Sequence, residues 1–307
     1  MTHSRRLFEF KDGFEEVPTG LHLIAGLSGF TDAGSTLSQV ADQIFANLET
    51  KLVVQFKNDE LLDYRSRRPV MFFERDHIEH YEPPILGLYL VHDEVNQPFL
   101  YLHGYEPDFR WEEFAEAVLH LAEGLEVADF TWVHSIPFPI AHTRAVGVTV
   151  SGNRTEIIDA VSEWKPQTQV PGNVLHLLEF AFSQIDMPTV GYVMLVSHYL
   201  SESEYPQAAL KALEQISSAT GLVFPTDSNP QFSIVAQFLH KIYPYKYASY
   251  NSENQNLIPN QWNKISIDYL SAEARNVKDP FSTYLYLRGK SHVYVDDLKV
   301  EVFEKKD

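Results

Sequence analysis

The chain contains no cysteine among its 307 residues. That absence excludes disulfides, thiolate zinc sites and thiol nucleophiles, and it suits a reducing compartment, so we expect a cytoplasmic protein. No stretch approaches the roughly 18 apolar residues of a membrane span, and the amino terminus lacks the apolar core of a signal peptide. We therefore expect no membrane association.

Basic residues are scarce. The chain has 24 Lys and Arg against 42 Asp and Glu, a net charge of −18. Such an excess of negative charge opposes binding to nucleic acid or to anionic lipid, so we expect no nucleic-acid partner and only a local site for any anion. Hydrophobic residues make up 44% of the chain and charged residues 21%, which is typical of a globular protein.

The negative charge is confined to one part of the chain. Residues 1–225 hold 14 basic and 32 acidic residues, whereas residues 226–307 hold 10 of each. A polar stretch rich in Asn also marks the second part, where it is typical of a loop. At a length that suits about two domains, the sequence predicts one domain over 1–225 and a separate extension over 226–307.

In the first part, strand-like segments alternate with amphipathic helical segments, which indicates an α/β fold with a mixed, largely parallel sheet. Segments 70–73, 85–91 and 99–102 follow one another without a helix, so we expect antiparallel neighbours there. Helices are predicted after Asp32, after Asp108 as a cap, over 174–185 behind a cap at Asn173, and over 204–220 up to Gly221. Further strands are predicted at 21–27, 51–56, 130–135, 145–150 and 191–196.

The second part is predicted to be rich in β-strands. Apolar and polar residues alternate over 265–269, as in a half-buried antiparallel strand. Segments 284–287 and 292–303 are also predicted to be strands, the latter with a bulge or turn at its Asp pair.

The first candidate site is the segment Gly29-Phe-Thr-Asp-Ala-Gly34, where a strand passes into a helix. Free amides and the helix dipole at such a place can hold an anion. The spacing fits neither a P-loop nor a dinucleotide fingerprint. Asp32 can also cap the helix itself and fill the place of an anion, so both interpretations stay open.

A second candidate is the arginine cluster Arg65, Arg67 and Arg68, which stands out in an acidic chain. Guanidinium groups bind phosphate or carboxylate well. Pairing with the adjacent acidic residues of 59–63 in a surface or subunit-contact loop is the alternative. Arg110 lies in a third polar segment, at an expected helix start.

Polar residues also gather at predicted strand ends. His142 and Arg144 follow one strand, and Asn153 and Arg154 follow the next. His198, just past another strand, is expected to join the same end of the sheet, where α/β proteins often bind ligands. His can act as an acid or base near neutral pH, yet no nucleophile accompanies it, so structural roles stay open.

The best metal candidate is His77-Ile-Glu-His80, and its spacing fits no zinc motif. The segment is also predicted to be a loop rather than a helix face. We therefore expect no metal and no cofactor.

The order of these motifs resembles that of the bacterial proteins of the proteasome assembly chaperone family. The resemblance covers about residues 5–225 and rests on segments 29–34, 59–69, 106–111, 139–144, 151–154, 170–173, 197–199 and 205–209. It implies a three-layer α/β/α fold, similar to nucleoside phosphorylases and related hydrolases, and assembly as a homo-oligomer. The eukaryotic relatives are chaperones that build proteasome rings. The resemblance implies no established catalytic residues.

The extension departs from this family. Segments 261–269 and 294–303 resemble the closing strands of a jelly-roll module of the carbohydrate-binding kind. About 80 residues are too few for the roughly eight strands of a complete jelly roll.

Two hypotheses about function follow. The first is a non-enzymatic oligomeric scaffold or assembly factor with a possible protein partner. The second is an enzyme or sensor for a small anionic ligand, either nucleoside-like or phosphate-like, bound at the strand ends. The candidate ligand or interface residues are Gly29, Asp32, Arg65, Arg110, His142, Arg144, Asn153, Arg154 and His198.

Overall fold

A computed structural model describes residues 7–225, 232–238, 247–251 and 281–287. The chain divides into two compact units, Met1–Pro225 and Thr226–Asp307. Each unit is built around its own sheet.

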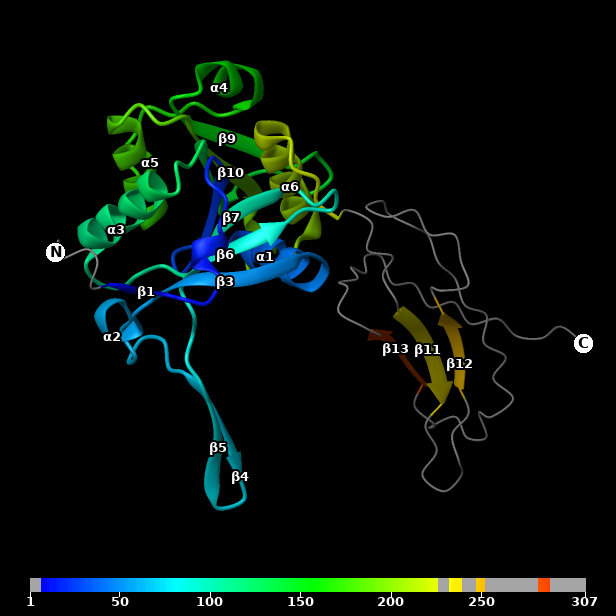
Figure 1. Ribbon diagram of the computed structural model, residues 1–307. Helices are drawn as coiled ribbons and strands as arrows, with labels where there is room; N and C mark the ends of the chain where they lie inside the picture. Colours follow the sequence, from blue (N-terminus) through cyan, green and yellow to red (C-terminus); the bar gives the residue numbers. More distant parts are fainter. Residues whose placement is uncertain (1–6, 226–231, 239–246, 252–280, 288–307) are drawn as a thin grey trace, which may run out of the picture. The chain divides into compact units, whose positions relative to one another are not determined.

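The first unit contains an eight-stranded sheet in the order β1-β3-β6-β7-β2-β8-β10-β9 (Figure 1). Strands β7, β2, β8 and β10 run parallel to one another, and β1, β3, β6 and β9 each pair antiparallel with their neighbours. The sheet is therefore mixed with a parallel centre, as predicted. The strands are β1 (Phe8–Phe10), β2 (His22–Ser28), β3 (Glu49–Phe56), β6 (Gly87–His92), β7 (Pro98–Tyr105), β8 (Asp129–Phe138), β9 (Gly147–Gly152) and β10 (Thr189–Ser197).

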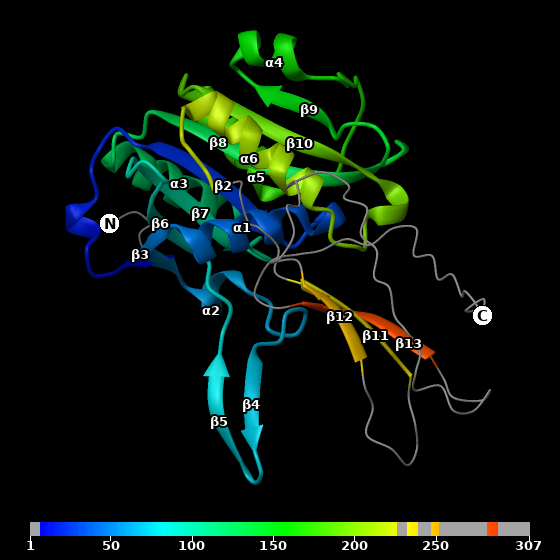
Figure 2. The same ribbon diagram turned by 90° about the vertical axis from the view of Figure 1, so that its right-hand side faces the viewer.

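Helices cover both faces of this sheet and complete the three layers. Helices α1 (Thr36–Asn47) and α6 (Pro206–Thr220) pack on one face, and α3 (Trp111–Gly124) and α5 (Val174–Gln184) pack on the other (Figure 2). Alternate residues of β2 divide between two buried clusters: Leu23 packs towards α3, and Ile24 packs towards α1. The alternation of a strand thus builds two separate cores. Short helices α2 (Asn58–Leu61) and α4 (Thr155–Val161) and turns η2 (Phe14–Glu16), η3 (Ala33–Ser35) and η4 (His198–Leu200) complete the unit.

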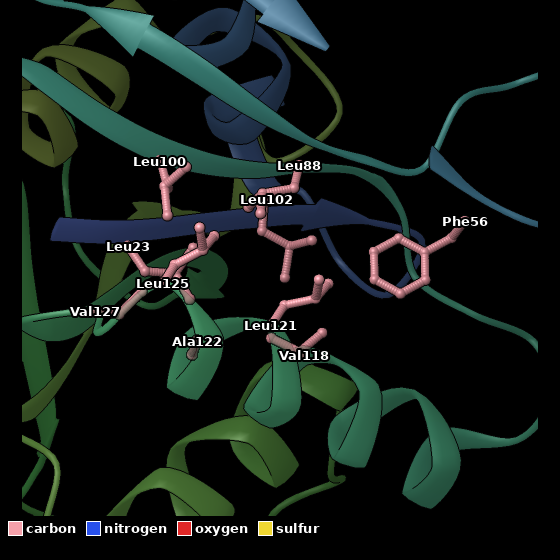
Figure 3. A pocket seen from close by; sticks show the side chains of 10 residues that line it. All are labelled: Leu23, Phe56, Leu88, Leu100, Leu102, Val118, Leu121, Ala122, Leu125 and Val127. Atoms are coloured by element: carbon pink, nitrogen blue, oxygen red, sulfur yellow. The ribbon is translucent and has the colours of Figure 1, made fainter. Parts of the chain in front are cut away.

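A small cavity lies in the core between the sheet and α3 (Figure 3). Its volume is about 10 Å³ and only apolar side chains line it, among them Leu23, Leu100 and Leu121. A water molecule needs polar partners to occupy such a space. The cavity is therefore a packing gap rather than a binding site.

Capping residues mark the starts and ends of the helices largely as predicted. The Asn173 side chain accepts the His176 amide at 2.9 Å, and the His176 ring accepts the Asn173 amide in return. Gly221 ends α6 with a φ of 78°, in the left-handed region that favours glycine. The predicted cap at Asp108 is wrong, because Arg110 is the residue that precedes α3 and the Asp108 carboxylate instead accepts the Asp63 amide at 2.7 Å.

Two segments form a separate ribbon instead of joining the main sheet. Strands β4 (Val70–Glu74) and β5 (His77–Glu82) pair only with each other. The ribbon projects away from the body of the first unit (Figures 1 and 2). The prediction of a loop around His77 is therefore wrong, because that segment is a strand with exposed side chains on both faces.

The second unit contains a three-stranded antiparallel sheet in the order β12-β11-β13. Its strands are β11 (Phe232–Phe238), β12 (Tyr247–Asn251) and β13 (Phe281–Leu287). The strand predicted at 284–287 is thus confirmed. Those predicted at 265–269 and 292–303 lie outside the described residues.

Gly191→Ala tests the packing of the central sheet. A Cβ atom at Gly191 would lie 2.2 Å from the Trp132 ring, which is buried and donates a hydrogen bond to Glu179. We expect urea unfolding to show a loss of about 1–3 kcal/mol or more, the usual cost of an overpacked core.

The matched control is Gly124→Ala at the end of α3, where a Cβ atom would meet nothing within 4 Å. We expect that change to be neutral or to stabilise by up to about 1 kcal/mol. Equal effects of the two substitutions would contradict this account of the core.

Candidate functional site

The parallel strands bring distant segments of the chain to one edge of the sheet. Strands β2, β7, β8 and β10 end at Ser28, Tyr105, Phe138 and Ser197, so the segments that follow them lie along this carboxyl edge. Open α/β sheets commonly bind ligands at this edge.

Asp32 caps helix α1. Its carboxylate accepts the Leu37 amide at 2.7 Å, the Ser38 amide at 3.2 Å and the Ser38 hydroxyl at 2.9 Å. The Ser135 hydroxyl lies 3.3 Å from the same carboxylate. The side chain therefore occupies the position at which a bound anion would meet the helix amides.

Gly29 allows Arg67 to reach the carboxyl edge. Gly29 has a φ of 146°, and a Cβ atom there would lie 2.6 Å from the Arg67 guanidinium and 3.1 Å from the Glu106 Cβ. Arg67 donates to the Glu106 carbonyl at 2.5 Å, pairs with Asp108 at 3.1 Å and covers the Tyr105 ring. The glycine and the arginine thus join two motifs that the sequence separates.

Glu106 fills the amino terminus of a second helix. Its buried carboxylate accepts the Val174 amide at 2.7 Å, at the start of α5. Burial raises the pKa of Glu106, and the hydrogen bond from Val174 and the charge of Arg67 oppose that rise. Helices α1 and α5 are therefore both capped by carboxylates of the chain itself.

His134 is a second buried titratable group near this edge, and it was not among the predicted site residues. The side chain is 2% exposed, its Nε2 lies 3.1 Å from the Thr31 hydroxyl, and the Phe30 ring stacks on it. Burial lowers the pKa of His134 to about 4, so the imidazole is neutral. Its Nδ1 has no hydrogen-bond partner among the described residues. The only available signal was a histidine within an apolar strand.

The Thr31 and His134 pair does not have the arrangement of an activated nucleophile. The Thr31 hydroxyl also donates to the Ser135 carbonyl at 3.2 Å. A catalytic histidine normally has its second nitrogen oriented by a carboxylate or carbonyl, and in the described chain His134 lacks that third group.

The two predicted arginines nearest this site do not converge on it. Arg110 pairs with Glu113 at 2.5 Å and also with Glu60. The two glutamates contact different nitrogens of its guanidinium group. Arg65 is exposed, and its main-chain amide donates to the Asp63 side chain at 2.9 Å. Of the arginines in the 59–69 segment, it is Arg67 that reaches the carboxyl edge.

His142, Arg144 and His198 do lie near the carboxyl ends of β8 and β10. Tyr199 links two of them: its hydroxyl is 2.7 Å from the His142 ring, and its own ring lies edge-on to His198. Arg144 is exposed. These groups lie at the surface, His198 in η4 and the other two in the segment after β8, rather than around an enclosed space.

Asn153 and Arg154 lie at the opposite edge, which corrects the prediction that they join His142. Strand β9 runs antiparallel to β10, so its last residue, Gly152, pairs with Val190 near the start of β10. Asn153 there bonds to the main chain of Thr189 and Met187. Arg154 donates to the Ala219 carbonyl at 3.1 Å.

Two further features are absent from the described part of the chain. It holds no group of three or more His, Asp or Glu side chains able to bind a metal ion. Among its helices, none has the length and apolar character needed to cross a bilayer.

The low pKa of His134 predicts a loss of stability in acid. The unfolded chain takes up this proton near pH 6.5 and the folded chain only near pH 4, so stability is complete above 6.5 and falls as the pH drops towards 4. We expect His134 to account for about 2 kcal/mol of the loss at pH 5. His22, whose pKa is raised by its hydrogen bond to Asp129, acts in the opposite direction.

Urea unfolding of the wild type and His134→Phe at pH 7.5 and pH 5 measures this contribution. The variant should lose less stability between the two conditions than the wild type. An identical pH dependence of the two proteins would contradict the buried, neutral state of His134.

Comparisons with known proteins give the relatives of this chain. Over about 71% of its length it is 38% identical to Rv2714 of Mycobacterium tuberculosis, a protein of unknown function, covering 78% of that chain with a TM-score of 0.68. A protein of unknown function from Corynebacterium glutamicum is 36% identical over 72% of this chain and 83% of its own, again with a TM-score of 0.68.

The proteasome-assembly chaperone homologue Rv2125 of Mycobacterium tuberculosis shares the fold, with 19% identity, a TM-score of 0.62, and coverage of 67% of this chain and 87% of its own. Among curated proteins, none matches the sequence. The model of the PAC2 family matches residues 26–234, which include every motif of the carboxyl edge. The predicted family is thus confirmed, and the chain belongs to the PAC2 family.

Proposed function

We propose that the protein is a non-enzymatic, homo-oligomeric scaffold or assembly factor that acts in the cytoplasm through protein contacts. The observation that carries the proposal is the exposed apolar ribbon β4–β5. The fold it shares with a proteasome-assembly chaperone homologue supports an assembly role.

One face of the ribbon is apolar. Met71 pairs with Tyr81 and Phe73 with Ile78 across the two strands, so these four side chains share a face. Between 50% and 61% of each is exposed. An isolated two-stranded ribbon is only marginally stable in water, and a contiguous apolar patch is typical of an interface.

A second copy of the chain is the occupant that suits this face. Two such ribbons can pack apolar face to apolar face about a two-fold axis, because each supplies the same surface. The opposite face is mixed: it carries Glu74, His77, His80 and Glu82 together with the exposed side chains of Val70 and Phe72. The ribbon thus has one wholly apolar face, which suits burial against a second copy, and one mixed face.

The alternative function is the binding of a small anionic ligand. Several of the residues predicted to bind it instead make contacts within the chain. Asp32 and Glu106 occupy the helix termini at the carboxyl edge, and Arg110 is engaged by two glutamates. Asn153 and Arg154 lie at the other edge. These contacts favour the scaffold.

Met71→Ser combined with Phe73→Ser tests the role of the ribbon. We expect sedimentation equilibrium to show an oligomer for the wild type and a monomer for the double variant, because the substitutions remove the apolar contact. Both positions lie outside the buried cores, so the free energy of unfolding of the monomer should change by no more than about 0.5 kcal/mol.

Val95→Ser, which changes a single exposed valine elsewhere, is the control and should keep the wild-type mass. A wild type that is monomeric at every concentration would refute the proposal. So would a double variant that keeps the mass of the wild-type oligomer.

A further inference from the structure

Acidic residues accumulate on helix α3, which itself contains no Lys or Arg. From residue 111 to 143 the chain contains no Lys or Arg, and the same is true from 166 to 210, which includes α5. Glu112, Glu116 and Glu123 are exposed, and no described Lys or Arg lies within ion-pair distance of them. Their spacing of four and seven places them on one face of the helix.

An exposed apolar strip lies on the neighbouring helix. Phe180 is 63% exposed although it lies in the middle of α5, and Ile185 at its end is 44% exposed. Leu177, one turn before Phe180, is only partly buried against the core, as is Leu119 of α3. Helices α3 and α5 contact each other, so the acidic face and the apolar strip belong to the same helical layer.

The opposite helical layer lacks this combination. Helices α1 and α6 expose no large apolar side chain within the described chain. On α6, Lys211 lies 3.6 Å from Glu214, so the charges there are balanced. The apolar and acidic surface is therefore specific to α3 and α5 rather than a general property of the helices.

We propose that this α3/α5 face docks a basic amphipathic helix of a partner protein. An apolar ridge on that helix would pack against Phe180 and Leu177, and Lys or Arg beside the ridge would pair with Glu112, Glu116 and Glu123. Helix-in-groove recognition uses this division between apolar anchors and complementary charge. The face is separate from the ribbon, so the inference does not depend on oligomerisation.

A labelled peptide of about 18 residues, with Leu and Lys at helical spacing, is the probe. We expect saturable binding in fluorescence anisotropy that weakens when the salt concentration rises, because salt screens the glutamates. Phe180→Ser, and separately Glu116→Lys with Glu123→Lys, should each weaken binding about tenfold.

Glu94→Lys with Glu202→Lys changes the net charge equally at exposed positions elsewhere, and should leave the affinity within about twofold. The ribbon variant Met71→Ser with Phe73→Ser should also bind normally. Phe180→Gln repeats the test if the serine variant does not fold. Absence of saturable binding, or an equal loss in both charge-reversed pairs, would overturn the proposal.

Discussion

The parallel pairing of β7, β2, β8 and β10 is the constraint on which the rest of the first unit depends. It gathers the segments after Ser28, Tyr105, Phe138 and Ser197 at one edge, although they are far apart in the sequence. It also directs helices α1, α3, α5 and α6 back across the two faces of the sheet. The family motifs are therefore joined by sheet topology rather than by sequence distance.

At that edge, carboxylates of the chain itself accept hydrogen bonds from the free amides of two helix amino termini. Asp32 neutralises the amino terminus of α1, Glu106 does so for α5, and Arg67 ties the Gly29 turn to the Glu106 segment. A site built to bind an anion would leave those amides free. Within the described residues, the ribbon and the α3/α5 face instead present exposed apolar side chains, and this distribution favours a protein that works through contacts with other proteins.

Local patterns predicted much of the fold. The Asn173 cap, the stop at Gly221 and the α1 stripe depend on neighbouring residues, and the structure has them. Features that depend on how the strands pair and on contacts between distant segments could not be predicted in the same way. The direction of β9 decides where Asn153 and Arg154 lie, and Asp108 is used by Asp63 and Arg67 because the fold brings them together. His134 was missed because burial, which the sequence does not give, creates its shifted pKa.

The most direct test of the central claim is a thermal-shift titration of the protein with phosphate, nucleosides, nucleotides, sugar phosphates and carboxylates. A ligand that prefers the folded state raises the melting temperature, and the rise grows with the logarithm of the ligand concentration above Kd. Because chain carboxylates occupy the helix termini at the carboxyl edge, the account predicts no concentration-dependent shift from any of these compounds. A concentration-dependent shift that Arg144→Ala abolishes would contradict it and would identify the protein as one that binds a small anion.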